Sequence, residues 1–400
     1  MKFGRSWGQL GMIYKSINEI ADVTKLAGFE FTKHIKYIEN GEIIALRALN
    51  LRDGHLDLKD IKRIDKNTSE QLTRSKLYKN DIVISYTGTI GECAQIREND
   101  KYHLAPNVAK ITPDPIFVNP QYLFHYIRSS MFRNQMYNYC HGSTQPTIPM
   151  KTIRELSIPI PSFKTQKQIA SILSALDDKI ELNNRINENL LEQLHVLYLR
   201  IFCDSAMDTP LGDVVATTSG GTPSRKHDEY YSDSSICWVK SKELLGNYIH
   251  ETEEHINDLA VKKSSAKLLP EHSILIAMYG ATVGAYGVIS KPMTCNQAVC
   301  ALLCNQDYPY TYLFQIAYES QQKFINLAVG SAQQNISQVL IKQLNLHSDL
   351  DIIQKFHSLA FPIHKEIESL QAENIRLSTL RYNLLPKLMN GEIDVSKVKI

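Results

Sequence analysis

The chain has 400 residues, of which 43% are hydrophobic and 22% are charged. Its 44 lysines and arginines nearly balance its 42 aspartates and glutamates, which leaves a net charge of +2. This composition excludes a low-complexity disordered chain and a polyelectrolyte tail, and the length predicts two or more domains. Nucleic-acid binding stays open, because it needs a local basic surface rather than a basic total.

The N-terminus and the cysteines indicate where such a chain works. MKFGRSWGQLGMIYKSINEI has no apolar core long enough for a signal peptide. Seven cysteines form no C-x-x-C pair, and an odd number without a framework predicts a reducing, cytoplasmic compartment. Cys295, Cys300 and Cys304 crowd together, but their run is apolar and strand-like and has no matching histidine spacing. We interpret them as small buried hydrophobic residues rather than as metal ligands.

Taken in chain order, the predicted elements of the first half return in the second. Any one match is weak, but six in the same order are strong. The pairs are IIALR from Ile43 with ICWVK from Ile236, IVI from Ile82 with ILI from Ile274, the glycine turns Gly88–Gly91 and Gly280–Gly284, APNVAKI from Ala105 with CNQAVCA from Cys295, QYLFHYI from Gln121 with TYLFQIA from Thr311, and GSTQPTIPMKTIREL from Gly142 with GSAQQNISQVLIKQL from Gly330. The offsets drift from 193 to 188, as small loop insertions in two diverged copies of one domain would require.

One stretch of the second half could be mistaken for a membrane span. HSILIAMYGATVGAYGVIS from His272 carries no full charge, but it contains three glycines and several small polar residues. Its counterpart in the first half is broken by Asp81, Glu92 and Arg97. A buried strand, a glycine turn and a second strand explain the pattern better, so no membrane contact is expected.

Each copy ends in a long predicted helix. Residues 163–202 contain no glycine or proline, and their apolar residues recur in steps of three and four, which is typical of a heptad seam. In the second helix we expect a kink or late start at Pro362 and a stop at Pro386. The simplest interpretation of Asn187 and Asn374 is that they set the register. The predicted seam comprises Ile169, Ile172, Leu176, Ile180, Asn187, Leu190, Leu194 and Leu197 in the first helix, and Phe356, Leu359, Ile363, Ile367, Leu370, Asn374, Leu377 and Leu384 in the second.

These elements predict an α+β fold of two repeated globular domains. The domains occupy residues 1–160 and 204–348, and the helices occupy 161–203 and 349–390, followed by a tail at 391–400. A helix of some 38 residues spans roughly 57 Å and needs a partner along its length. We therefore expect the two helices to separate and join the domains as an antiparallel coiled coil about a pseudo-two-fold axis.

Catalytic signatures are missing. The sequence has no phosphate-binding loop, dinucleotide fingerprint, H-E-x-x-H or G-x-S-x-G motif, and no Asn- or Asp-Pro-Pro-aromatic motif of an amino-methyltransferase. Asp177 and Asp178 form the one paired carboxylate of note, in a helix rich in exposed charge. We expect no catalytic residue and no metal site, and we interpret the chain as a recognition protein.

The sequence resembles the specificity subunit of a Type I restriction–modification enzyme along nearly its whole length. The motifs that carry the resemblance are GGTPSRKHDEYY from Gly220 followed by ICWVKSKEL, the TGTIG and YGATVG turns, the two GS-x-Q segments, QKQIASILSALDDKIELNNRINENL, and LLPKLMNGEID near the end. The first half departs from the pattern, because DVTKLAGFEFT stands where GGTPS would be expected.

The resemblance implies a non-catalytic subunit that reads double-stranded DNA in a prokaryotic cytoplasm. Each of two target-recognition domains would read one half of a bipartite, asymmetric site, and the helices would set the unread gap and dock two methyltransferase subunits. Restriction (translocase) subunits would join for cleavage. S-adenosylmethionine, ATP and Mg²⁺ would belong to those partners, so that this chain itself carries no cofactor.

Candidate DNA contacts come from equivalent positions of the two copies. Arg47 and Lys240 each follow a strand, where a cation can reach a phosphate or a guanine edge. The remaining candidates are polar or glycine residues of turns and loops, where a backbone can be approached closely or a glutamine can pair with adenine. They are Thr87, Gly88, Thr89, Ser143, Thr144, Gln145, Gly221, Thr222, Ser224, Arg225, Lys226, Tyr279, Thr282, Gln333 and Gln334.

Each candidate also has a plainer interpretation: a solvated cation, an ordinary polar turn or a tight hairpin. A second function class is open as well, namely a non-enzymatic coiled-coil scaffold that tethers two protein-binding domains without touching DNA. Binding to duplex DNA that weakens steeply with salt would distinguish the DNA reader from the scaffold.

Overall fold

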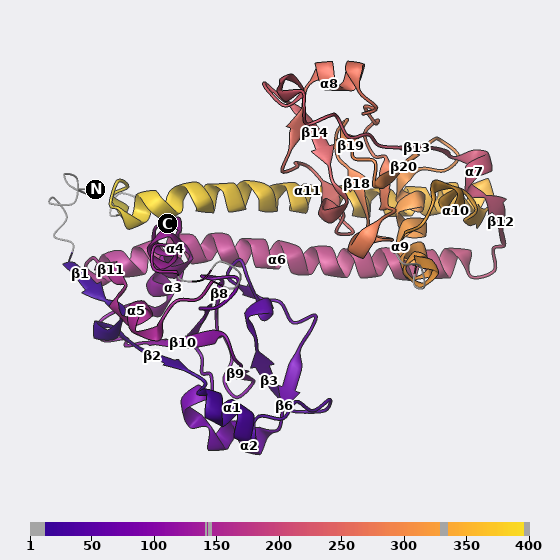
Figure 1. The fold of residues 1–400 in the computed structure, drawn as a ribbon. Coiled ribbons are helices and arrows are strands. Elements are labelled where there is room, and N and C mark those ends of the chain that lie inside the picture. Colours follow the sequence, from indigo (N-terminus) through magenta and orange to yellow (C-terminus); the bar gives the residue numbers. More distant parts are fainter. Residues whose placement is uncertain (1–12, 141, 143–145, 329–334, 396–400) are drawn as a thin grey trace. The chain divides into compact units, whose positions relative to one another are not determined.

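The computed structural model describes residues 13–140, 142, 146–328 and 335–395. They fall into two compact units, which are described separately: unit 1 contains residues 1–180 and 377–400, and unit 2 contains residues 181–376. The chain passes from one unit to the other twice, within helix α6 (Phe163–Phe202) and within helix α11 (Leu350–Met389) (Figure 1).

Unit 1 is built on a four-stranded antiparallel sheet of order β2-β10-β7-β8. A second sheet of order β6-β3-β9 pairs β3 antiparallel with β6 and parallel with β9. The elements are β1 (Ile13–Ser16), β2 (Ala21–Lys25), α1 (Gly28–His34), β3 (Ile43–Leu46), β4 (Leu51–Arg52), β5 (His55–Leu56), β6 (Lys62–Ile64), α2 (Lys66–Gln71), β7 (Ile82–Ser85), β8 (Cys93–Gln95), β9 (Tyr102–Leu104), β10 (Val108–Pro113), α3 (Pro120–Arg128), α4 (Ser130–Tyr137), α5 (Met150–Glu155) and β11 (Ser157–Ile160).

Unit 2 repeats this topology. Its main sheet has the order β13-β20-β17-β18-β15, and β14 pairs antiparallel with β16 and parallel with β19. Its elements are β12 (Met207–Pro210), α7 (Leu211–Val214), β13 (Ala216–Ser219), β14 (Ile236–Val239), β15 (Tyr248–Ile249), β16 (His255–Ile256), α8 (Asp258–Lys263), β17 (Ile274–Ala277), β18 (Tyr286–Ile289), β19 (Thr294–Cys295), β20 (Val299–Leu303), α9 (Tyr310–Ala328), α10 (Gln338–Lys342) and β21 (Asn345–His347). The internal repeat expected from the sequence is confirmed by this strand order.

The stretch that could have been mistaken for a membrane span forms β17, a glycine turn and β18, as expected. No helix within the described ranges is long and apolar enough to cross a membrane. Cys295 and Cys300 are fully buried in different core clusters, and burial raises the pKa of each thiol to about 12. These two cysteines are therefore the buried hydrophobic residues that the sequence predicted.

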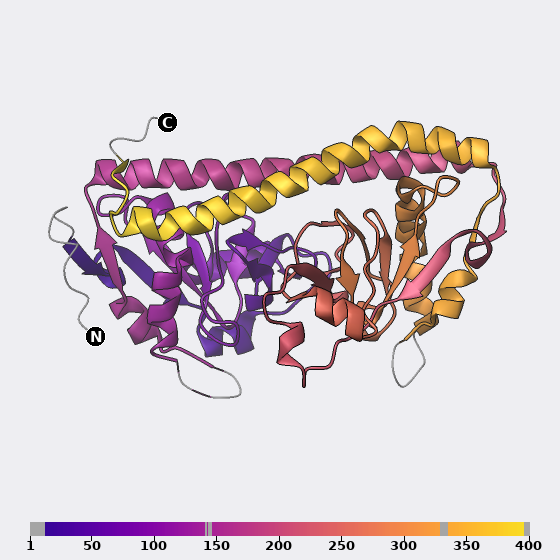
Figure 2. The ribbon, with the colours of Figure 1, turned by 90° about the horizontal axis from the view of Figure 1, so that it is seen from above.

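Helices α6 and α11 lie side by side and antiparallel in each unit (Figure 2). In unit 2, the amide of Asn183 donates to Glu373 at 2.7 Å and to Asn374 at 2.9 Å. Asn374 in turn donates to Asn184 at 2.8 Å. Asn374 thus pairs with both Asn183 and Asn184, whereas Asn187 is buried with its carbonyl oxygen unpaired among the described residues.

The buried face of the helices is only partly the predicted seam. Leu359 is 47% exposed, and Ala360 is fully buried in its place. In α6, Leu173, Tyr198 and Phe202 are buried and were not predicted. The predicted residues Ile172, Leu176, Leu190 and Leu197 are half-buried. The difference arises because each helix packs with one half on the core of unit 1 and with the other half on the core of unit 2, and this packing needs a broader apolar face than a two-helix seam.

The proline predictions for α11 were wrong about its ends, since the helix starts at Leu350 and ends at Met389. The start is capped by the carboxylate of Asp349, which accepts from the backbone N–H of Ile352 at 3.1 Å. An interior proline costs about 3 kcal/mol. Burial of Phe356 and Ala360 before Pro362, and of Leu388 and Met389 after Pro386, offsets this cost.

Asp177 anchors both long helices to the sheet domain of unit 1. Its carboxylate, 4% exposed, accepts from Arg128 of α3 at 2.5 Å and from Arg381 of α11 at 2.5 Å. Arg128 also donates to the carbonyl of Asp53 at 3.0 Å, where Gly54 leaves room that a Cβ atom would fill. Burial alone would raise the pKa of Asp177, but the cations around it, chiefly Arg128, hold that pKa below its usual value. The role of Asp177 is therefore structural.

We expect Asp177→Asn to lower the free energy of unfolding of unit 1 by about 3–5 kcal/mol, because two buried guanidinium groups lose their counter-charge. The folded-state pKa lies below the unfolded value of 3.8, so the stabilisation is present above that pH and is lost as the pH falls through the folded pKa. Urea unfolding at neutral and acidic pH measures both effects. Asp178→Asn is the matched control, since the Asp178 side chain is 69% exposed. Equal losses from both variants would contradict the prediction.

Candidate nucleic-acid interface

In unit 1, the turn between β9 and β10 is hydrogen-bonded to the ends of two other strands, β3 and β7. Each of these strands is followed by a predicted DNA contact. The backbone N–H of Ala105 donates to Leu46 at 3.0 Å, and that of Tyr86 donates to Asn107 at 3.1 Å. Arg47 follows Leu46, and Thr87 follows Tyr86. Two candidates from distant parts of the sequence therefore each follow a residue that is bonded to this turn.

The glycine turn that follows β7 receives the end of the loop that precedes α5. The N–H of Gly88 donates to the carbonyl of Pro146 at 2.9 Å, and the hydroxyls of Thr87 and Thr147 lie 3.0 Å apart. The N–H of Ile148 donates to Tyr86 at 3.0 Å. The predicted contacts Ser143, Thr144 and Gln145 lie outside the described residues. Residues 146–148, which follow them, lie against the glycine turn.

Unit 2 repeats the arrangement. The N–H of Asn296 donates to Val239, the residue before Lys240, at 2.9 Å. The N–H of Met278, the residue before Tyr279, donates to Ala298 at 2.8 Å. Tyr279 pairs with Asn335, as Thr87 pairs with Thr147 in unit 1. The predicted contacts Gln333 and Gln334 lie outside the described residues.

Gly88 and Gly280 leave open space at the tips of the two turns. Their φ angles are 79° and 71°, and a Cβ atom added to either would meet no atom of the described residues within 4 Å. Gly284, in the same turn as Gly280, is different, because its Cβ would lie 2.9 Å from the carbonyl oxygen of Gln321. Among the described residues, none blocks the approach of a ligand to these tips, whereas the later glycine serves packing. Beside them, Thr89 is exposed, Tyr279 is 46% exposed, and the Thr282 hydroxyl donates to Tyr279 at 3.2 Å.

The prediction that the backbone N–H groups of Gly220 and Gly221 would bind a phosphate is wrong. Gly220 donates to Val299 at 3.1 Å, and Gly221 donates to Cys295 at 2.9 Å. A Cβ atom on Gly220 would lie 2.2 Å from the backbone of Cys295, and one on Gly221 would lie 2.2 Å from the backbone of Ser265. These glycines are required for close packing and offer no free donor. The side chains that follow them, Thr222, Ser224, Arg225 and Lys226, are exposed.

Three of the four predicted cations, namely Arg47, Arg225 and Lys240, are held by carboxylates. In unit 2, Lys240 and Arg225 both pair with Glu254 and both lie over the ring of Trp238, each 5.5 Å from its centre. Hydrogen bonds from Lys240 and Arg225 hold the pKa of the Glu254 carboxyl below its usual value. In unit 1, Arg47 pairs with Asp60 at 3.0 Å. A phosphate would therefore compete with an existing partner at each of these cations.

Sequence reasoning missed three residues at these edges. Asn107 and Gln297 are exposed at the tips of the β9–β10 and β19–β20 turns, and Asn107 has a φ of 72°. Lys25 is exposed, and its ammonium lies 5.3 Å from the ring centre of Tyr86. The match of APNVAKI with CNQAVCA was the available signal for the first two, because it aligns polar residues between two apolar strands.

Comparisons with known proteins agree with this two-fold arrangement. A model of the Type I restriction modification DNA specificity domain matches residues 11–192 and again residues 206–348. The Type I restriction enzyme HindI specificity subunit of Haemophilus influenzae is 22% identical over 94% of this chain and 98% of its own length. The MjaIX specificity subunit of Methanocaldococcus jannaschii is 26% identical over 70% of each chain. The crystal structure of a Type I restriction-modification system S subunit from M. genitalium has the same fold, with a TM-score of 0.58 at 14% identity over 97% of this chain and 98% of that one.

Proposed function

Because the chain belongs to the Type I restriction modification DNA specificity domain family, and so recognises a DNA sequence, we propose that each unit reads one half of a bipartite, asymmetric site. The observation that carries the proposal is the edge found in both units, where an open glycine turn, a loop end and a strand-end cation meet. The alternative of a protein-binding scaffold does not explain why this edge is repeated in both units. Membership of the family favours the DNA reader over the scaffold.

We further propose that α6 and α11 set the unread gap and dock two methyltransferase subunits, which restriction subunits then join. Large apolar side chains exposed along these helices support a docking role, because they are available for contacts with another protein. They are Val196, Leu199, Leu359, Phe361, Ile375, Leu380 and Tyr382. S-adenosylmethionine, ATP and Mg²⁺ would be bound by these partners, in the cytoplasm of the host.

The purified chain alone is expected to show no methyl transfer, DNA cleavage or ATP hydrolysis. Addition of its methyltransferase subunits should produce methylation of one bipartite motif, and binding of the complex to DNA should weaken steeply with salt. Methylation sequencing of a random DNA library measures the motif. Methylation by a preparation shown to be free of partner subunits would overturn the assignment, as would DNA binding that is indifferent to salt.

Gly88→Asn tests the glycine turn directly. Asparagine tolerates a positive φ, and its Cβ would meet no atom of the described residues within 4 Å, so we expect the melting temperature to change little. If DNA approaches this turn closely, the added side chain should weaken binding by the assembled complex at least about tenfold, or 1.4 kcal/mol. Gly391→Asn is the control, because Gly391 also has a positive φ of 74° but follows α11. Unchanged DNA binding by a folded Gly88→Asn variant would remove this turn from the interface.

A further inference from the structure

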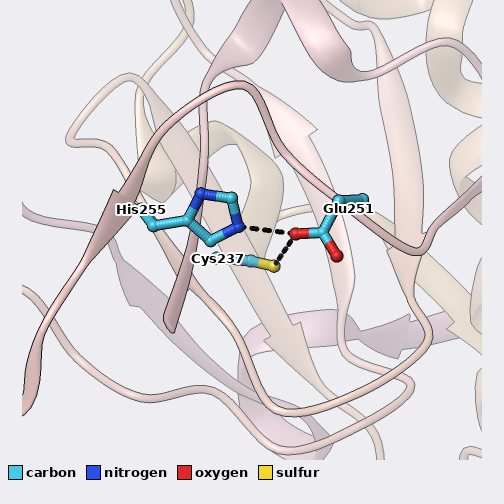
Figure 3. A group of neighbouring side chains, drawn as sticks. All are labelled: Cys237, Glu251 and His255. Carbon is cyan, nitrogen blue, oxygen red and sulfur yellow. Dashed lines mark hydrogen bonds and ion pairs between the residues drawn. The ribbon is translucent and has the colours of Figure 1, made fainter. Parts of the chain in front are cut away.

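Cys237, Glu251 and His255 form a compact cluster in unit 2 (Figure 3). Cys237 on β14 and His255 on β16 are directly opposite each other in an antiparallel pair. Glu251 belongs to the connection between these strands, and its Oε1 accepts from the thiol of Cys237 at 3.0 Å. The same oxygen lies 2.5 Å from Nε2 of His255. The three potential ligand atoms all lie within 4.8 Å of one another.

We propose that these three side chains bind one thiophilic divalent metal ion, of which Zn²⁺ is the type. A thiolate, an imidazole and a carboxylate are the side chains that zinc prefers, with bonds of about 2.0–2.3 Å. Tetrahedral geometry places such ligand atoms roughly 3.5 Å apart. The Glu251 side chain is 54% exposed and can move outward by the required distance, while the other two ligands stay on their strands. On binding, the thiol proton is released to solvent and a water molecule completes the coordination.

Lys291 supports the assignment as a neighbour of the ligands. Its ammonium lies 3.1 Å from Oε2 of Glu251, the oxygen that does not contact Cys237 or His255. Oε1 therefore remains for the metal, while Lys291 fixes the orientation of the carboxylate. Hydrogen-bonded partners of this kind commonly orient the carboxylates and imidazoles that bind metals.

The corresponding place in unit 1 has no such ligands. There the β3–β6 pair sets Ile44 opposite Arg63, where the β14–β16 pair sets Cys237 opposite His255. The metal would thus belong to one domain only. It would pin β14 to β16 immediately before Lys240 and beside Glu254. Lys240 and Glu254 form an ion pair at the edge of unit 2. The proposal stands on this cluster and does not depend on what the chain recognises.

A second cluster, Glu271, His272 and Glu368, also brings three potential ligands within the same separation. It offers no thiol, and His272 stacks on the ring of Tyr310 with centres 4.2 Å apart. A metal at that place would have only nitrogen and oxygen ligands. The two clusters can therefore be told apart by spectroscopy.

The test is titration of the full-length, tag-free and metal-stripped chain with Co²⁺, a coloured substitute for Zn²⁺. The proposal expects one equivalent to bind with a thiolate-to-cobalt charge-transfer band, and one equivalent of Zn²⁺ to abolish that band. Cys237→Ala and His255→Gln should each lose the band or weaken Co²⁺ binding at least tenfold. Cys295→Ala is the matched control, since both cysteines are buried in the same core cluster, and it should keep the band.

Melting curves guard against a variant that does not fold, and His255→Gln, at a position whose side chain is 28% exposed, is the safer substitution. Zn²⁺ should raise the melting temperature of the wild-type chain and of Cys295→Ala, but not that of His255→Gln. Absence of a thiolate band in the wild-type chain would overturn the proposal. So would a band that persists in Cys237→Ala.

Discussion

Exchanging residues 1–155 for the equivalent segment of a relative with a different target should change one half of the methylated site and leave the other half intact. Each unit has its own core: residues of β2, β7 and β10 form clusters in unit 1, and residues of β14, β15 and β17–β20 form clusters in unit 2. A change in the first reader should therefore leave the side chains of the second in place. The measurement is the methylated motif of the assembled complex.

The structure also states what the donor segment must supply. It needs a first strand able to pair with β11, because Ile13 lies opposite Ile160. It also needs an arginine equivalent to Arg128, because Asp177 and Arg381 remain in the recipient. The reciprocal exchange of residues 204–348 is the control and should alter only the other half. Changes in both halves from a single exchange, or loss of definition in the untouched half, would refute two independent readers.

The architecture could be predicted from the sequence because local residue patterns that recur in the two halves indicate its strands and helices. Apolar runs broken by glycine located β7 and β17, and the absence of glycine and proline located α6 from Phe163 to Phe202. Local patterns could not show that Leu359 faces solvent while Ala360 is buried, since that depends on the surface against which α11 packs. Nor could they show that α11 continues through Pro362, because burial elsewhere offsets the lost hydrogen bond.

The candidate interface was less accessible because its members meet through tertiary contacts. Thr87 and Thr147 are 60 residues apart in the sequence, yet their hydroxyls touch. Glu254, which pairs with both Lys240 and Arg225, belongs to no sequence motif that would have identified it. The glycines of GGTPS suggested a phosphate cradle, but only the structure shows their N–H groups bonded to Cys295 and Val299. A glycine in sequence permits both close packing and ligand approach, and the space around it decides between them.

Lengthening both long helices by four residues, after Ile180 and after Arg376, should leave both half-sites unchanged and widen the unread gap by one or two base pairs. These are the two places where the chain passes between the units. Four residues add about 6 Å of helix, and B-DNA rises about 3.4 Å per base pair. Paired insertions keep the contacts within each unit, including those of Asp177 with Arg381 and of Asn183 with Asn374.

The phase of the helix provides the control for this experiment. Four residues turn a helix by about 400°, only about 40° more than one full turn, so each unit nearly recovers its orientation. Two residues turn it by about 200°, which would rotate one reader by more than half a turn relative to the other and should abolish methylation of any bipartite site. Inserting four residues in α6 alone would break the register with α11 and should reduce stability as well as activity. Motif sequencing of all three variants decides the matter, because full activity with an unchanged gap after the paired four-residue insertion would mean that α6 and α11 do not set the spacing.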